Sequence, residues 1–157
     1  MTAADLAMLL KRSIEQAEKL AKWTNRSLHL VKDVGLRTPL SPEDLDAFEA
    51  LTGRFARLSD LLMKRVFRLL DAVELEDEGT LLDALNRAEK RGVISSAGRF
   101  REIRELRNAI AHEYAEEDLL PLFRLVREAS PELIEAVRQT ANYAERLFRP
   151  SGGYGQP

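Results

Sequence analysis

The sequence contains no cysteine, so the fold has no disulfide bond and no thiolate metal site. It has no run of about 18 apolar residues, which argues against a transmembrane helix. Glycine and proline are scarce, with 8 and 6 among 157 residues, and apolar residues nowhere alternate with polar ones at a period of two. These absences argue against a β-sheet and favour helices.

An excess of either charge is also lacking, because 24 basic and 26 acidic residues give a formal net charge of −2. A protein that coats nucleic acid is expected to be strongly basic, so this class is disfavoured, while a local basic cleft is compatible with the composition. The apolar N-terminal stretch 1–10 contains Asp5, and no small-residue cleavage site follows it. A signal peptide is therefore not predicted, and we expect a cytoplasmic protein.

Apolar residues recur at steps of three and four along most of the chain, as in amphipathic helices. In the second predicted helix this stripe continues as far as Leu69 and Val73. Start and stop signals divide the chain into helices over 5–31, 41–73, 80–92, from Ser95 or Ser96 to between His112 and Tyr114, from Glu116, and from Ser130 to Phe148.

Two prolines separate the last two predicted helices. Pro121 is placed in the first turn of a fifth helix, where proline is tolerated, and Ser130-Pro131-Glu132 is interpreted as the start of a sixth. The predicted fold class is all-α, an up-and-down bundle of about five to six helices. We expect one domain over residues 1–149 and a disordered tail over residues 150–157, which are rich in glycine and proline.

Two stretches are rich in arginine and lysine although the whole chain is slightly acidic. Residues 54–68 contain five basic residues and one acid, Asp60, and residues 87–107 contain seven basic residues and three acids. If the stretches converge, they form a positive groove that can hold several phosphate groups. The alternative is a set of solvated helix faces with internal salt bridges. The candidate RNA-binding residues in these stretches are Arg54, Arg57, Arg99 and Arg104.

Chemistry is concentrated in one segment, residues 107–114, with the sequence Arg-Asn-Ala-Ile-Ala-His-Glu-Tyr. The other histidine, His29, stands among leucines late in the first predicted helix and is expected to be structural or exposed. Two histidines so far apart in a chain without cysteine make a zinc site improbable, and no cofactor is predicted.

The spacing within this segment restricts its geometry. Asn108 and His112 are four residues apart, so on one helix they share a face and can hydrogen-bond, which would orient the imidazole. Arg107 and His112 are five apart, about 140° around an ideal helix. Both can reach one phosphate only if the helix ends near Ala111 or if a second copy of the protein supplies the missing side. Either arrangement predicts a cleft.

An arginine, an asparagine and a histidine placed in this way can cleave RNA without a metal ion. An imidazole has a reference pKa near 6.5, so it can act as general base or acid when the 2′-hydroxyl attacks the adjacent phosphate. A guanidinium can stabilise the charge of the transition state through two parallel hydrogen bonds. The spacing alone is equally compatible with a structural histidine near a helix C-terminus, where the helix dipole favours it.

The pattern Arg-x4-His-x-Tyr, formed by Arg107, His112 and Tyr114 with Asn108 after the arginine, resembles the signature of the HEPN superfamily. More narrowly, the chain resembles the HepT toxins of the HepT/MntA (HEPN/MNT) toxin–antitoxin type. The stretches 54–60 and 86–92 also look like that family, and the resemblance extends over about residues 5–148.

The resemblance implies a metal-independent RNA endonuclease, with tRNA or mRNA as candidate substrates. Arg107 and His112 would then be the catalytic residues, supported by Asn108. Tyr114 would be the residue to which an MntA-like nucleotidyltransferase antitoxin attaches AMP, which silences the toxin. The resemblance also implies a homodimer whose two motifs face each other. The alternative function is a non-catalytic helical partner, or substrate-binding protein, of a minimal nucleotidyltransferase.

Overall fold

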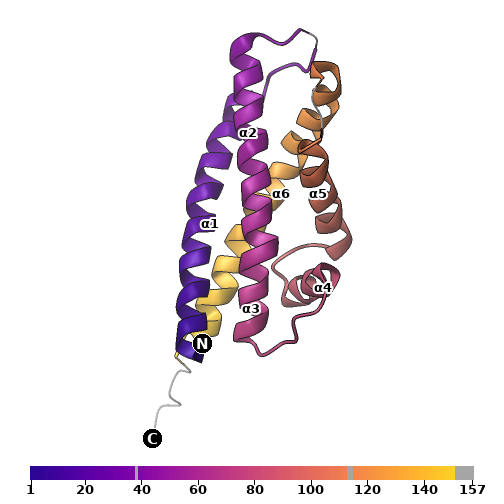
Figure 1. Ribbon diagram of the computed structural model, residues 1–157. Coiled ribbons are helices and arrows are strands. Elements are labelled where there is room, and N and C mark those ends of the chain that lie inside the picture. The colour runs from indigo at the N-terminus through magenta and orange to yellow at the C-terminus, as the bar shows by residue number, and fades with distance from the viewer. Residues whose placement is uncertain (38, 113–114, 151–157) are drawn as a thin grey trace, which may run out of the picture.

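The computed structural model describes residues 1–37, 39–112 and 115–150, although not the side chains of residues 116 and 117. Within these residues the chain forms helices and no strand, and long helices run up and down side by side (Figure 1). The predicted all-α, up-and-down bundle is therefore confirmed. None of the described helices is both long enough and apolar enough to cross a membrane.

The first helix, α1 (Ala3–Val31), lies where the stripe of apolar residues predicted it. Thr2 closes its N-terminus in a capping box, in which the Thr2 hydroxyl accepts from the backbone N–H of Asp5 and the Asp5 carboxylate accepts from Thr2. At the other end, Arg127 donates to the backbone carbonyls of Val31 (3.0 Å) and Val34 (2.7 Å). Both ends of α1 thus have partners for backbone groups that a helix leaves unpaired.

The second predicted helix is one continuous rod made of three parts, α2 (Pro42–Asp60), a π-helical segment η1 (Leu61–Val66) and α3 (Phe67–Val73). Ser41 caps its start, as predicted, and accepts from the N–H of Asp44 at 3.1 Å. The backbone stays in the right-handed helical region at both junctions of η1, so the rod changes its winding without a break.

The π-helical segment changes which residues of α3 face the core. The sequence predicted that the apolar stripe continues through Leu69 and Val73, but these two are only half-buried. Leu70 and Asp71 are buried in their place. A π-helix bonds residue i to i+5 and therefore uses more residues per turn than the 3.6 of an α-helix, so it rotates the residues that follow. The predicted inward face of α3 was wrong for this reason.

The next two helices have the predicted boundaries at their start. Thr80 forms a capping box with Asp83 ahead of α4 (Leu81–Arg91), and Gly92 ends this helix in the left-handed conformation at φ 78°. Ser96 caps α5 (Ala97–Ile110). The short α4 packs against α3 and α5 at one end of the bundle (Figure 1).

The predicted fifth and sixth helices are a single helix, α6 (Glu116–Phe148), with both Pro121 and Pro131 inside it. Ser130 is not an N-cap, since its hydroxyl donates back to the carbonyl of Val126 at 2.6 Å as in a helix interior. An internal proline costs about 3 kcal/mol. The helix continues because the side chains that flank Pro131 form one buried stripe, each worth about 1.5–3 kcal/mol when fully buried. These are Val126, Ala129, Leu133, Ala136 and Val137.

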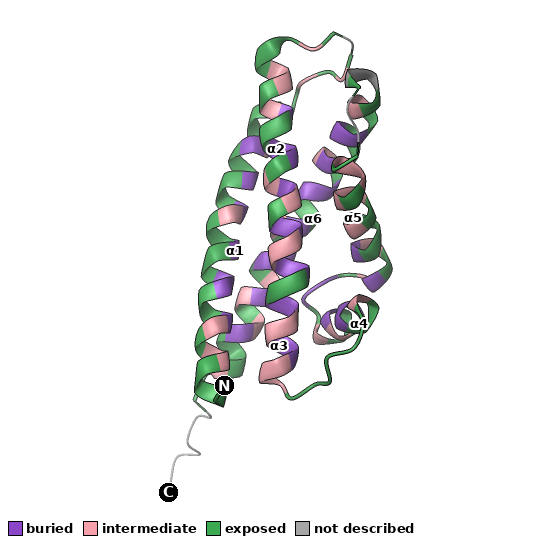
Figure 2. Cartoon of the chain, viewed as in Figure 1, coloured by how far each residue is buried: buried purple, intermediate pink, exposed green. Residues whose placement is uncertain are grey.

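The core lies between α1, the α2–α3 rod and α6, and buried residues turn toward this shared interior in Figure 2. At its centre, the rings of Phe48 from α2 and Phe123 from α6 stack with centroids 5.0 Å apart. The helix α5 packs against α2 on the side away from α1, as the contacts between elements and Figure 1 agree. This packing places the last turn of α5 beside the end of α2.

Candidate active site

The candidate site lies where α5 ends. The backbone N–H of Ala111 donates to the carbonyl of Asn108 (3.2 Å), and the N–H of His112 donates to that of Ala109 (3.0 Å). These bonds tighten the last turn, and the helix stops at Ile110 with Ala111 as its C-cap. The first of the two predicted arrangements, a helix that ends near Ala111, is confirmed. His112 is exposed just beyond this end.

The predicted hydrogen bond between the side chains of Asn108 and His112 is not among the contacts of the described residues. Both residues are exposed, and the four-residue relation fails because His112 lies past the last helical residue. Tyr114 lies outside the described residues. The structure therefore brings Arg107, Asn108 and His112 to one helix end without a direct contact between them.

Arg107 is held from the neighbouring helix. Its Nε and Nη2 atoms donate to the two carboxylate oxygens of Asp60, at 2.8 Å and 2.9 Å. This two-point contact fixes the plane of the guanidinium as well as its position. The hydrogen bond from Arg107 lowers the pKa of Asp60 below its ordinary value, and the same bond raises the pKa of Arg107. Both groups are therefore charged at neutral pH.

Asp60 is the centre of a small cationic cluster. Besides Arg107, the Nζ of Lys64 lies 3.5 Å from its carboxylate and Nη1 of Arg104 lies 4.0 Å from it. Three cations around one carboxylate leave a local excess of positive charge, which suits a bound phosphate. The sequence did not give Asp60 a role. Its only signal was its position as the single acid among five basic residues in the stretch 54–68.

Arg107 keeps one side available. The contact with Asp60 uses its Nε and Nη2, while Nη1 has no partner among the described residues. The side chain of Arg107 is 26% exposed, so this side of the guanidinium can meet a ligand from solvent. An arginine that is oriented on one edge and open on the other is suited to stabilise developing negative charge.

The four candidate RNA-binding arginines lie in different places. Arg104 joins the cluster around Asp60, and Arg57 is exposed on α2 one turn before it. Arg54 turns toward α1, where it donates to the Trp23 carbonyl and the Ser27 hydroxyl. Arg99 turns toward α6 and donates to Glu132 at 2.7 Å, a bond that raises its pKa. An RNA contact by each of the four stays a prediction.

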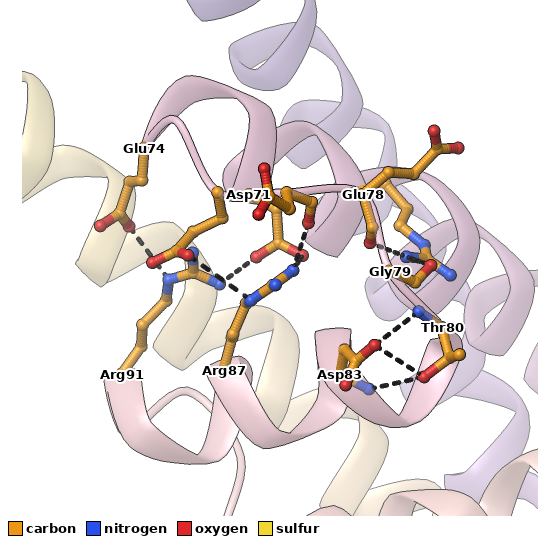
Figure 3. A network of polar contacts seen from close by, with 11 residues as sticks. Asp71, Glu74, Glu78, Gly79, Thr80, Asp83, Arg87 and Arg91 are labelled. Carbon is orange, nitrogen blue, oxygen red and sulfur yellow. Dashed lines mark hydrogen bonds and ion pairs between the residues drawn. The ribbon is translucent and has the colours of Figure 1, made fainter.

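Several basic residues of the stretch 87–107 form internal salt bridges, the alternative that the sequence left open. Arg87 and Arg91 reach from α4 to the buried Asp71, at 3.2 Å and 2.7 Å, and Arg91 also donates to Glu74 (Figure 3). Burial opposes the charge of Arg91, but its two acidic partners outweigh that effect and raise its pKa. This network ties α4 to α3. It leaves Arg104 and Arg107 as the basic residues of the stretch that meet Asp60.

His29 is exposed on α1, as one of the two predicted outcomes has it. Among the residues that the structure describes, no group of three or more His, Asp or Glu side chains is placed to hold a metal ion.

The family model for ribonucleases of the HepT-like type matches residues 10–140. The chain belongs to the HepT-like ribonuclease family. Its bundle is HEPN-like, and the resemblance first based on Arg107, His112 and Tyr114 is confirmed. Comparisons with curated proteins and with solved structures gave no match. The matched range includes the end of α5 and Asp60, so the candidate site lies within the part shared with the family.

Proposed function

We propose that this HepT-like chain is an endoribonuclease that cuts RNA without a metal ion and acts as the toxin of a toxin–antitoxin pair. The observation that supports the proposal most directly is the bidentate contact of Asp60 with Arg107 next to the helix end that exposes His112. The family supports ribonuclease chemistry in general. Metal independence and the toxin role are our inferences from the site residues and the family resemblance.

In the proposed reaction, the imidazole of His112 accepts the proton of a ribose 2′-hydroxyl. The 2′-oxygen then attacks the adjacent phosphorus atom, and the bond from phosphorus to the 5′-oxygen breaks. The leaving oxygen takes a proton from water or from a second imidazole. The products are a 2′,3′-cyclic phosphate and a 5′-hydroxyl, which confines the reaction to RNA.

Arg107 acts on the phosphate in this reaction. Because Asp60 holds its Nε edge, its open Nη1 can donate to a phosphoryl oxygen as negative charge develops there. Asn108 supports the site from the same turn of α5. A homodimer that brings two copies of the helix end together would supply the second imidazole, and we propose this assembly as the active form.

Regulation is proposed at Tyr114, two residues after His112. An MntA-like nucleotidyltransferase would attach AMP to its hydroxyl. The added phosphate brings negative charge beside an arginine and a histidine, so it would compete with RNA for the same cations.

The decisive experiment measures RNA cleavage by the purified chain in the presence of a chelator. Arg107→Ala and His112→Ala are each expected to lower kcat by at least about 100-fold, the usual effect of removing one transition-state donor or a proton-transfer group. His29→Ala is the matched control, because it removes the other, exposed histidine. Cleavage should leave 2′,3′-cyclic phosphate ends.

Two results would contradict this function. One is cleavage that persists in both site variants, and the other is activity only after a metal ion is added. If the pure protein leaves RNA intact and its expression does not arrest growth, the non-catalytic partner of a nucleotidyltransferase becomes the better description.

A further inference from the structure

The only tryptophan of the chain, Trp23, is exposed on α1 and yet held in place by α2. The residue is 54% exposed, whereas its neighbour Thr24 is fully buried. The guanidinium of Arg54 lies over the indole, 5.2 Å from its centroid, and donates to the backbone carbonyl of Trp23 at 3.2 Å. A large exposed aromatic that is already fixed loses little entropy when it binds a ligand.

The charges around Trp23 have one sign. From residue 19 to residue 32, α1 and the residue after it contain no acid. Within about one turn of Trp23 three exposed basic residues follow the outer side of the helix. These are Lys19, Lys22 and Arg26. An aromatic ring among cations is the combination that proteins use to bind single-stranded nucleic acid, because bases stack on the ring and phosphates meet the cations.

This surface continues over α2 to the candidate active site. Arg54, Arg57 and Asp60 follow one another at steps of three residues, so each is turned about 60° from the last. Arg57 is exposed on the crest of α2, while the other two are half-buried on its flanks, one toward α1 and one toward α5. Six residues at 1.5 Å each put Arg54 roughly 9 Å from Asp60 along the axis. Figure 1 shows α2 between α1 and α5.

The crest is also low. Gly53, one turn before Arg57, is exposed, and a Cβ built on it would have no atom within 4 Å. A glycine inside a helix costs about 0.5–1 kcal/mol relative to alanine, and packing in the described residues does not account for it here. A missing side chain does let a ligand approach the helix backbone closely.

We propose that Trp23, Arg54 and Arg57 form a binding site for single-stranded RNA beside the bond that is cut. One base stacks against the exposed part of the Trp23–Arg54 pair, and Arg57 contacts a phosphate on the way to Arg107. The inference rests on the proposed endoribonuclease function and names its substrate contact. It gives Trp23 a role that its exposure on the fold leaves unexplained.

The test uses the fluorescence of the full-length chain, in which Trp23 is the only tryptophan. The protein carries His112→Ala, and the probe is a single-stranded RNA oligonucleotide with 2′-O-methyl groups, which lacks the attacking hydroxyl. Titration should change the emission until it saturates. By fluorescence anisotropy of labelled RNA, Trp23→Ala should bind roughly 5- to 100-fold more weakly, as for the loss of one base stack.

Controls separate stacking from other causes. Trp23→Phe retains an aromatic face and should retain most of the affinity. Met8→Ala removes another exposed apolar side chain of α1, far along the helix, and should bind as the parent does. With cleavable RNA, Trp23→Ala should raise KM and leave kcat unchanged, because the residue touches a base away from the reacting atoms.

Three results would overturn the inference. They are an emission that RNA does not change, a Trp23→Ala variant that binds RNA as tightly as the parent, and an emission that changes with protein concentration alone, which would make this face a contact between copies. Failure of the proposed function is a separate result, since it would appear as intact RNA with the unsubstituted chain. RNA could then still quench Trp23.

Discussion

At the scale of single residues, Asp60 determines how Arg107 meets a phosphate. The carboxylate takes two hydrogen bonds from the guanidinium and has Lys64 and Arg104 nearby. Its pKa is lowered mainly by the bond from Arg107. A carboxyl whose pKa is lower in the folded than in the unfolded state stabilises the fold above its unfolded pKa, and this contribution is lost as pH falls through the folded value. At neutral pH the contact is complete.

Replacing this carboxylate separates positioning from binding. Asp60→Asn removes one acid from a cluster of cations, so RNA should bind at least as tightly and KM should stay equal or fall. The guanidinium loses its two-point support, and kcat should fall by roughly 10- to 100-fold, since small misplacements of a catalytic group are costly. Steady-state kinetics on one RNA substrate measures both constants.

Asp60→Glu keeps the charge and should recover part of kcat. Asp46→Asn, an exposed aspartate on the same helix, serves as the control and should change neither constant. If Asp60→Asn instead raises KM with an unchanged kcat, Asp60 contributes to RNA binding and does not position Arg107.

The sequence could predict Arg107 and His112 as site residues but not their partner. The helix end near Ala111 followed from spacing, because two side chains about 140° apart need it in order to share a ligand. Asp60 lies 47 residues before Arg107, and only the packing of α5 against α2 brings the two together. Pairing of this kind has no local signature, whereas caps such as Thr80 and Gly92 do.

At the scale of helices, local signals predicted where most elements begin, and tertiary packing decided the rest. The starts at Ser41, Thr80 and Ser96 follow from capping chemistry. The π-helical segment and the continuity of α6 through Pro131 do not, because each depends on which face the core can bury. Proline after serine looks like a helix start, and here buried residues on both sides override that signal.

The single α6 makes a testable statement about Pro131. This proline is exposed within the helix and cannot donate to the carbonyl of Arg127. Pro131→Ala restores that bond and should stabilise the fold by about 2 kcal/mol, since a helical proline costs about 3 and its stiffening of the unfolded chain returns about 0.4–1. For a protein of this size the melting temperature should rise by roughly 4–8 °C.

Pro42→Ala is the matched control, because Pro42 occupies the first position of α2, where proline is favoured. Thermal unfolding followed by circular dichroism should show no gain for that variant. If Pro131→Ala gives no gain either, residue 131 lies at a break between two helices, as the sequence alone suggested.

At the scale of the whole molecule, the charges divide by direction. Arg87, Arg91 and Arg99 turn to acids on neighbouring elements, while Arg57, Arg104 and Arg107 lie on or beside the outer side of α2. A chain of net charge −2 can therefore present a local positive surface. A phosphate placed on that surface from within the protein would compete with RNA. This is how modification of Tyr114 would silence the proposed toxin.

The antitoxin relation is tested by co-expression of the chain with a minimal nucleotidyltransferase, followed by intact mass spectrometry. The mass should increase by one or more AMP units, and the modified protein should lose RNA cleavage and growth arrest. Tyr114→Phe lacks the acceptor oxygen, so it should stay unmodified and remain toxic beside the active transferase. Tyr143→Phe is the control, because the Tyr143 hydroxyl already donates to Glu74 within the bundle. AMP on the Tyr114→Phe variant, or full cleavage by the modified parent, would show that Tyr114 is not the point of control.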